Sequence, residues 1–183
     1  MMTDRPSGSL VRESLGNLAP APEAPFPRDR VRFLLGDETV ELGGFEPALT
    51  VLDWLRGEAR RIGTKEGCNE GDCGACTVVV VQPEDGRLSY RAVNACIQFV
   101  GTLDGAQLLT VEDLKRPDGA LHAVQQALVD CHGSQCGFCT PGFVMSLFAM
   151  LKTFDALPPQ GFRTKNSVAT VCLRRRDVML DPS

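Results

Sequence analysis

KEGCNEGDCGACT, the sequence of residues 65–77, sets three cysteines in the spacing C-x4-C-x2-C among glycines and acidic residues. We call this stretch the cysteine loop; a fourth cysteine follows Cys76 after nineteen intervening residues. This is the plant-type ligand spacing of a 2Fe–2S cluster, and thiolates are soft ligands that suit iron–sulfur chemistry. The intervening glycines let the backbone approach a bulky inorganic core closely. We therefore predict one 2Fe–2S cluster with four ligands, Cys68, Cys73, Cys76 and Cys96.

Three other interpretations of the cysteine loop stay open: a zinc knuckle, a disulfide cluster and a glycine-rich turn with buried thiols. Zinc sites usually show two C-x2–4-C pairs, whereas here three closely spaced cysteines precede a distant one. The first residues show no apolar segment behind a basic flank, so we expect no secretory signal and a cytoplasmic protein. In that compartment the eight cysteines of the chain argue for metal binding over disulfides.

Composition limits the classes of partner. With 183 residues the chain has room for one ordinary domain or two small ones, and 43% hydrophobic residues suffice for a packed core. A net charge of −4 gives no electrostatic footprint for nucleic acid or an anionic membrane. The longest nearly apolar run, residues 143–151, is far too short to span a bilayer. We therefore expect neither nucleic acid nor a membrane as a partner.

The first 29 residues differ in composition from the rest. Residues 1–29 are rich in proline, alanine and charge, with prolines at positions 6, 20, 22, 25 and 27. Proline fixes φ and removes a backbone donor, so this composition predicts a disordered extension. Regular structure is expected to begin at residue 30.

Residues 30–114 show the pattern of a small mixed sheet with one helix. Residues 31–42 read as a hairpin, and a capping-box pattern at Thr50 opens a helix that we expect to end at Gly63. The apolar stripe of this helix is Val51, Leu52, Leu55, Ala59 and Ile62. Three more strands are expected at 77–81, 87–90 and 107–111. The order ββαβββ is that of a β-grasp ferredoxin domain, in which Trp54 is expected to be a core residue rather than a cofactor contact.

A helical pattern begins near residue 118. A first helix is expected to start at Asp118 or Gly119, with the apolar stripe Leu121, Val124, Leu128 and Cys131. A second is expected to begin at Thr140-Pro141, as N-cap and first helical residue, with the stripe Val144, Leu147, Phe148 and Leu151. Cys136 and Cys139 then lie at a helix N-terminus, where the dipole favours thiolates and an anionic cluster. A redox-active C-x-x-C is the alternative, although no thioredoxin-like βαβ pattern surrounds it.

Three motifs together resemble a known family. EGCNEGDCGACTVVV (66–80), NACIQFVGTLDG (94–105) and HGSQCGFCTPGFVMS (132–146) resemble the iron–sulfur portion of the molybdenum hydroxylases, the xanthine dehydrogenase and aldehyde oxidase family. The sequences of these motifs are most similar to the small subunit of bacterial xanthine dehydrogenases, and the resemblance covers residues 30–152. It implies an α+β fold: a β-grasp 2Fe–2S ferredoxin domain at 30–114, then a helical 2Fe–2S-binding domain at 115–173. Residues 174–183 remain as a tail.

The resemblance also implies a function. Electrons would pass from a molybdenum cofactor in a partner subunit through the helical-domain cluster, then the ferredoxin-domain cluster, to FAD and NAD in a flavin domain or subunit. By position, the four cysteines named above hold the outer cluster, Cys136 and Cys139 supply two of four ligands for the inner one, and Gln135 lies against the pterin. The implied reaction is xanthine or hypoxanthine oxidation. The chain has no H-E-x-x-H, P-loop, G-x-S-x-G or Rossmann motif, so we expect no complete active site in it alone.

Two other functions stay open. One is the small iron–sulfur subunit of an aldehyde, carbon monoxide or N-heterocycle hydroxylase, within the same family. The other, from a different class, is a zinc-stabilised interaction module without redox function.

The sequence departs from the family pattern after residue 152. The family supplies the other two inner-cluster ligands as a C-x-C, and this chain has only Cys172. Three explanations compete: a reading-frame shift near residues 155–165, a genuine fragment without a working second cluster, or replacement of the missing ligands by Cys131 and Cys172. Cys131 would repeat the plant-type spacing with the two later cysteines, but its place on an apolar stripe predicts a buried thiol instead.

Overall fold

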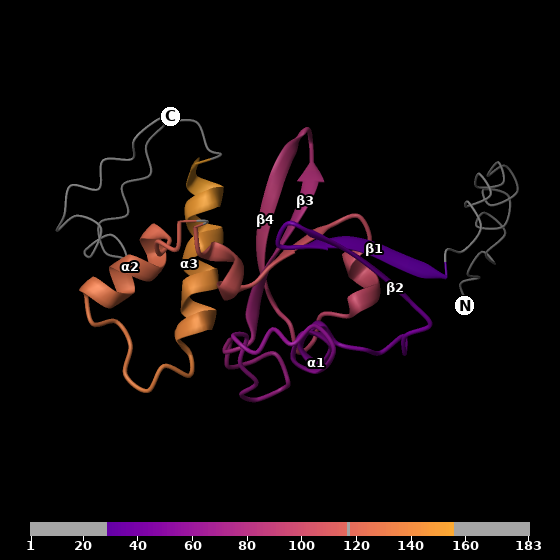
Figure 1. Cartoon of the computed structure of the whole chain (residues 1–183), viewed down its shortest axis with the longest axis horizontal. Helices are drawn as coiled ribbons and strands as arrows, with labels where there is room; N and C mark the ends of the chain where they lie inside the picture. The colour runs from indigo at the N-terminus through magenta and orange to yellow at the C-terminus, as the bar shows by residue number, and fades with distance from the viewer. Residues whose placement is uncertain (1–28, 117, 156–183) are drawn as a thin grey trace, which may run out of the picture.

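The computed structural model describes residues 29–116 and 118–155 (Figure 1). The predicted extension, up to residue 28, lies outside the described residues. So does everything from residue 156 on, which includes Cys172, the predicted tail and the proposed site of a frame shift. Within the described part, no helix is long and apolar enough to cross a bilayer.

A five-stranded mixed sheet forms the centre of the structure, in the order β2-β1-β5-β3-β4. The strands are β1 (Arg30–Leu35), β2 (Glu38–Gly43), β3 (Thr77–Glu84), β4 (Arg87–Asn94) and β5 (Gln107–Leu109). The hairpins β1–β2 and β3–β4 are antiparallel, and β5 joins them, parallel to β1 and antiparallel to β3. With α1 (Val51–Gly57) between β2 and β3, the predicted order ββαβββ and the α+β ferredoxin-like fold class are confirmed.

Helix α1 covers one face of the sheet. The Thr50 side chain accepts a hydrogen bond from the Asp53 amide, as the capping box predicts. Trp54 is buried, with its ring edge-on to Phe33 and the ring centroids 5.3 Å apart, so the prediction that it belongs to the core is confirmed. This core also contains the other buried residues of α1, the inward valines of β3 and Leu108; those members are Val51, Leu52, Leu55, Val78, Val80 and Leu108.

The end predicted for this helix was wrong by six residues. Helix α1 stops at Gly57, because the chain turns left-handed at Arg60 (φ +57°) and the Arg61 amide bonds back to the Leu55 carbonyl. Ile62, predicted as part of the apolar stripe, is 59% exposed. The residues from 58 to 76 therefore form one long connection that contains the cysteine loop.

The second face of the sheet is covered by helix α3 (Thr140–Asp155), which runs beside β3 and β4 with α2 (Ala123–Asp130) on its outer side (Figure 1). Val79 and Val81 point to this face, whereas Val78 and Val80 point to α1. Side chains alternate across a strand, so a run of valines is buried throughout only when both faces are covered. These two valines form a second core with four buried residues of α3, Val144, Met145, Phe148 and Ala149.

Helix α2 starts later than the sequence suggested, and its first turn explains why. His122 is its N-cap: the His122 ring nitrogen accepts from the Val124 amide, and the Gln125 side chain accepts from the His122 amide. The predicted start at Asp118 or Gly119 was wrong, because the helix begins only after its N-cap, His122, and the residues before His122 lie outside the helix. Two short 3-10 helices, η1 (Val100–Leu103) and η2 (Val111–Leu114), were not predicted.

Candidate metal centre

The four cysteines of the predicted outer cluster come from two neighbouring parts of the fold. Cys68 and Cys73 lie in the connection between α1 and β3, and Cys76 stands just before β3. Cys96 follows β4, which pairs with β3 along its whole length. Cys76 and Cys96 are only 2% and 5% exposed, while Cys68 is half-buried and Cys73 is exposed. The site therefore has a buried half anchored on the sheet and an outer half on the loop.

The sulfur atoms form two pairs. The Sγ atoms of Cys76 and Cys96 are 3.3 Å apart. In the loop, the Cys73 amide donates to the Sγ of Cys68 at 3.3 Å, and the Cys68 amide donates to the Sγ of Cys73 at 3.4 Å. Among the described residues no group of three or more His, Cys, Asp or Glu is placed to hold a single metal ion. Two thiol pairs fit a cluster of two irons, in which each iron takes two cysteine ligands, better than one tetrahedral zinc ion.

Backbone amides around the loop favour a negative sulfur. The pKa of Cys68 is lowered to about 7, first by the Cys73 amide and then by the amides of Glu70 and Asp72. Burial, followed by the neighbouring Cys76 thiol, raises the pKa of Cys96 to about 11. The Cys96 thiol therefore stays protonated in neutral solution until a bound metal ion displaces its proton.

The loop is braced by polar side chains from β3 and β4. The Asn94 side-chain amide donates to the Gly71 carbonyl, and the Thr77 hydroxyl donates to the Gly74 carbonyl at 2.7 Å. A Cβ on Gly67 would lie 2.7 Å from the Sγ of Cys73, so a side chain there would displace that sulfur. The chain's own residues therefore hold the shape of the loop and fit the donor set of a 2Fe–2S cluster.

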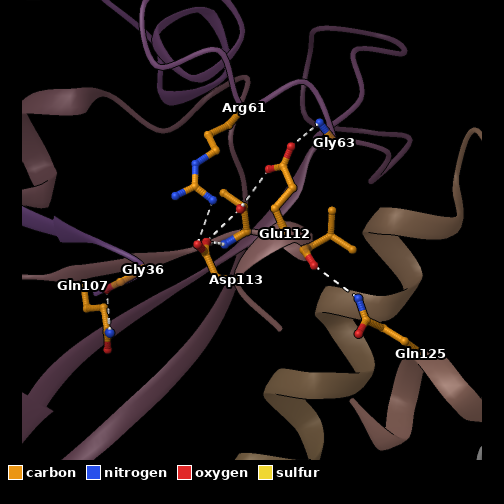
Figure 2. A network of polar contacts seen from close by, with 9 residues as sticks. Gly36, Arg61, Gly63, Gln107, Glu112, Asp113 and Gln125 are labelled. Carbon is orange, nitrogen blue, oxygen red and sulfur yellow. Dashed lines mark hydrogen bonds and ion pairs between the residues drawn. The ribbon is translucent and has the colours of Figure 1, made fainter. Parts of the chain in front are cut away.

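A polar network at η2 ties the segment before the cysteine loop to the rest of the molecule (Figure 2). Arg61 forms an ion pair with Asp113 at 2.8 Å, and the Gly63 amide donates to Glu112 at 2.9 Å. On the other side the Gln125 side chain of α2 donates to the carbonyl of Val111 at 3.2 Å. Sequence analysis missed this network, although the T-x-x-D pattern at 110–113 is a capping-box signal that could have located η2.

The second cysteine motif lies on the loop between α2 and α3. Gln135, Cys136 and Cys139 are all exposed there. The Cys139 carbonyl accepts from the Phe143 amide at 3.1 Å, so this cysteine occupies the N-cap of α3, one residue before the predicted cap. The placement at a helix N-terminus agrees with the prediction for the motif. Cys131, predicted as a buried thiol, is exposed among the described residues, because it is the C-cap at which α2 ends.

Two protein-family models match the chain. A 2Fe-2S iron-sulfur cluster binding domain matches residues 37–100, and a 2Fe-2S binding domain matches residues 110–170. The first match contains all four cysteines of the two thiol pairs, and the second contains the C-x-x-C motif and continues past the described residues. The chain is therefore similar to two 2Fe–2S-binding domain families in succession.

Curated relatives match over most of this chain but over a small part of their own length. A xanthine dehydrogenase of Emericella nidulans is 48% identical over 129 residues, which is 68% of this chain and 9% of the relative. A xanthine dehydrogenase of Oryza sativa subsp. japonica is 38% identical over 164 residues, 88% of this chain and 12% of the relative. Aldehyde oxidase 1 of Rattus norvegicus is 40% identical over 66% of this chain and 9% of the relative.

Solved structures share the fold. Quinoline 2-oxidoreductase from Pseudomonas putida 86 matches with a TM-score of 0.59 and 29% identity, over 70% of this chain and 74% of that chain. The aldehyde oxidoreductase from Desulfovibrio desulfuricans ATCC 27774 matches with a TM-score of 0.58 and 33% identity, over 69% of this chain and 13% of that chain. These relatives are named as dehydrogenases, oxidases or oxidoreductases.

Proposed function

We propose that this chain, which carries the iron–sulfur region of the molybdenum hydroxylase family of xanthine dehydrogenases and aldehyde oxidases, is the electron-transfer component of a larger oxidoreductase. The observation that carries the proposal is the pairing of the four thiols, Cys68 with Cys73 and Cys76 with Cys96, beneath a loop whose amides point at sulfur. A bound 2Fe–2S cluster supplies a carrier for one electron at a time. The protein holds the ligands, orients amides toward them and keeps water from the buried pair.

Each thiol pair has its own task in this proposal. Cys76 and Cys96 are buried against the sheet, where a low dielectric strengthens the interaction of thiolates with iron. Cys68 and Cys73 lie toward solvent, on the side from which an electron acceptor can approach. The pKa of Cys68, lowered to about 7, makes this thiol readily ionised in neutral solution.

The second cysteine motif is proposed to serve a second cluster nearer the molybdenum cofactor. Cys136 and Cys139 would be two of its ligands, and Gln135 would contact the pterin from the exposed loop. Electrons would then move from a molybdenum-cofactor subunit through this site to the outer cluster and on to FAD and NAD in a flavin domain or subunit. Support comes from the exposure of all three side chains, which leaves them open to a partner. The assembly is proposed to be cytoplasmic, where thiols stay reduced.

Oxidation of xanthine or hypoxanthine is the overall reaction proposed first, since the curated relatives at 38–48% identity include xanthine dehydrogenases. One observation favours a second candidate, the small subunit of an N-heterocycle hydroxylase. The matched chain of quinoline 2-oxidoreductase is covered over 74% of its length, so a separate chain of similar size exists in that enzyme. Purification of the chain from its natural source with its partner subunits, followed by turnover assays with purines and with quinoline-type substrates, separates the two.

The electron-transfer role itself is tested on the purified chain after anaerobic reconstitution with iron and sulfide. The proposal expects a red-brown protein that dithionite bleaches, with a paramagnetic signal from the reduced cluster. Two iron atoms per chain indicate the outer cluster alone, and four indicate that the second site is also filled. A colourless protein that retains zinc in place of iron would refute the proposal in favour of an interaction module.

A further inference from the structure

The first turn of α3 rests directly on the backbone between two candidate iron ligands. A Cβ built at Gly142 would overlap the Gly74 carbonyl oxygen and would lie 3.4 Å from the Cα of Ala75. These are backbone atoms, which cannot rotate away as the end of a flexible side chain can. Only glycine at 142 therefore allows α3 to lie this close to the cysteine loop.

The same carbonyl is held from its other side. The Gly74 oxygen accepts from the Thr77 amide at 3.1 Å and from the Thr77 hydroxyl at 2.7 Å. Gly74 itself has a φ of +71°, a conformation that side chains resist. The peptide between Cys73 and Cys76 is thus fixed between β3 and α3. A shift of α3 away from the sheet would release it on one side.

Phe138 makes the second contact between the two cysteine motifs. Its ring edge lies 3.7 Å from the position of a Cβ on Gly67, and Gly67 packs against the Sγ of Cys73. Cys73 is the exposed member of the outer thiol pair. Phe138 stands on the loop between Cys136 and Cys139, with 48% of its surface exposed. The ring therefore shields the backbone beside Cys73 from the side of the second motif.

We propose that Gly142 and Phe138 are positioning residues for the outer cluster, so that the second cysteine motif and the start of α3 set the geometry of the first. Cys73 and Cys76 belong to different thiol pairs, and the peptide at Gly74 fixes the separation of those pairs. Through that peptide, α3 would set how the two thiol pairs are placed around a bound cluster. The inference rests on the proposed function, since it requires a 2Fe–2S cluster at the four cysteines.

The test uses the full chain carrying Gly142→Ala, reconstituted beside the wild type. The extra methyl group displaces α3 from the Gly74 carbonyl and loosens the loop. Water then reaches the cluster and stabilises its reduced, more negative state, so the midpoint potential shifts to more positive values. The g-values of the reduced cluster change with it, and an iron chelator removes iron several-fold faster. Wild-type potential, g-values and chelation rate in this variant would overturn the proposal.

A matched variant separates this effect from a general loss of stability. Met145→Ala removes a buried side chain one helical turn along α3 but leaves the contact with Gly74 in place. It is expected to lower the melting temperature without moving the g-values or the potential. If Met145→Ala alters the spectrum as much as Gly142→Ala does, the effect is not specific to the contact and the proposal fails.

A second variant covers the case in which Gly142→Ala does not fold. Phe138→Ala changes a half-exposed ring, and it is expected to speed iron removal from the outer cluster by opening the backbone beside Cys73. An unchanged rate in Phe138→Ala would overturn the proposal. A wild-type chain that takes up no cluster refutes the proposed function instead, so the two failures are distinguishable.

Discussion

Asp113 offers a sharp test of how the cysteine loop is anchored. Its carboxylate is nearly buried and accepts three hydrogen bonds: 2.8 Å from Arg61, 2.7 Å from the Thr110 amide and 2.7 Å from the Thr110 hydroxyl. Thr110 is fully buried. Asp113→Ala leaves the Thr110 amide without this partner, whereas the Thr110 hydroxyl can still donate to Glu112 at 3.1 Å.

The cost follows from these contacts. A buried donor left unsatisfied costs about 1–3 kcal/mol. The Arg61 side chain is 23% exposed and can be rehydrated, so the lost ion pair adds at most about 1 kcal/mol. Asp113→Ala should therefore lower the free energy of unfolding by about 1–4 kcal/mol. Asp113→Asn keeps an acceptor for the Thr110 amide and should cost only about 1 kcal/mol.

Urea unfolding of the metal-free, reduced protein measures both values. Trp54 is the only tryptophan and is buried in the first core, so its fluorescence reports the unfolding of the sheet. Glu46→Ala, which removes an exposed carboxylate from the loop before α1, is the control and should change the free energy by less than about 0.5 kcal/mol. A loss below about 0.5 kcal/mol for Asp113→Ala, or equal losses for the alanine and asparagine variants, would refute the reasoning.

Three further predictions concern α3, α2 and the thiols. Met145→Ala should lower the free energy of unfolding by about 2–5 kcal/mol in the same assay, because the side chain is fully buried between α3 and the sheet. A loss below about 1 kcal/mol would show that α3 is not anchored there. Burial and two nearby cations lower the pKa of His122, so the folded state binds fewer protons than the unfolded state. The free energy of unfolding should therefore fall as the pH drops below about 6.5. His122→Asn should make this pH dependence weaker, and an unchanged pH dependence would contradict the prediction. In metal-free protein, alkylation followed by mass spectrometry should label Cys68 fast and Cys76 and Cys96 slowly, whereas equal rates would mean that the buried pair is open to solvent.

The sequence was sufficient for the features that depend on local spacing. The hairpin at 31–42 and the capping box at Thr50 are set by residues close together in the chain, and the structure has the predicted elements there. The spacing of Cys68 to Cys76 also located the loop that the family model matches. Patterns of this kind carry their own geometry, since a turn, a cap or a metal loop is built from neighbouring residues.

Features that depend on tertiary packing could not be predicted from the sequence. The valine run at 78–81 predicted a buried strand but could not say that α3 covers its second face. The early end of α1 depends on a left-handed Arg60, a residue type with no such preference. Histidine is a rare N-cap, so His122 gave no start signal for α2. The contact of Gly142 with the cysteine loop joins residues 68 positions apart in sequence and needed the fold to be seen.

The central claim is that four cysteines hold a two-iron cluster, and single substitutions test it most directly. Each of Cys68, Cys73, Cys76 and Cys96 is replaced by serine, with Cys131→Ser as an exposed control, and each variant is reconstituted and reduced for electron paramagnetic resonance. The account predicts that Cys131→Ser retains the wild-type signal of the outer cluster, while each of the four substitutions abolishes that signal or changes its g-values. A wild-type signal in any of the four, above all in Cys96→Ser, would contradict it.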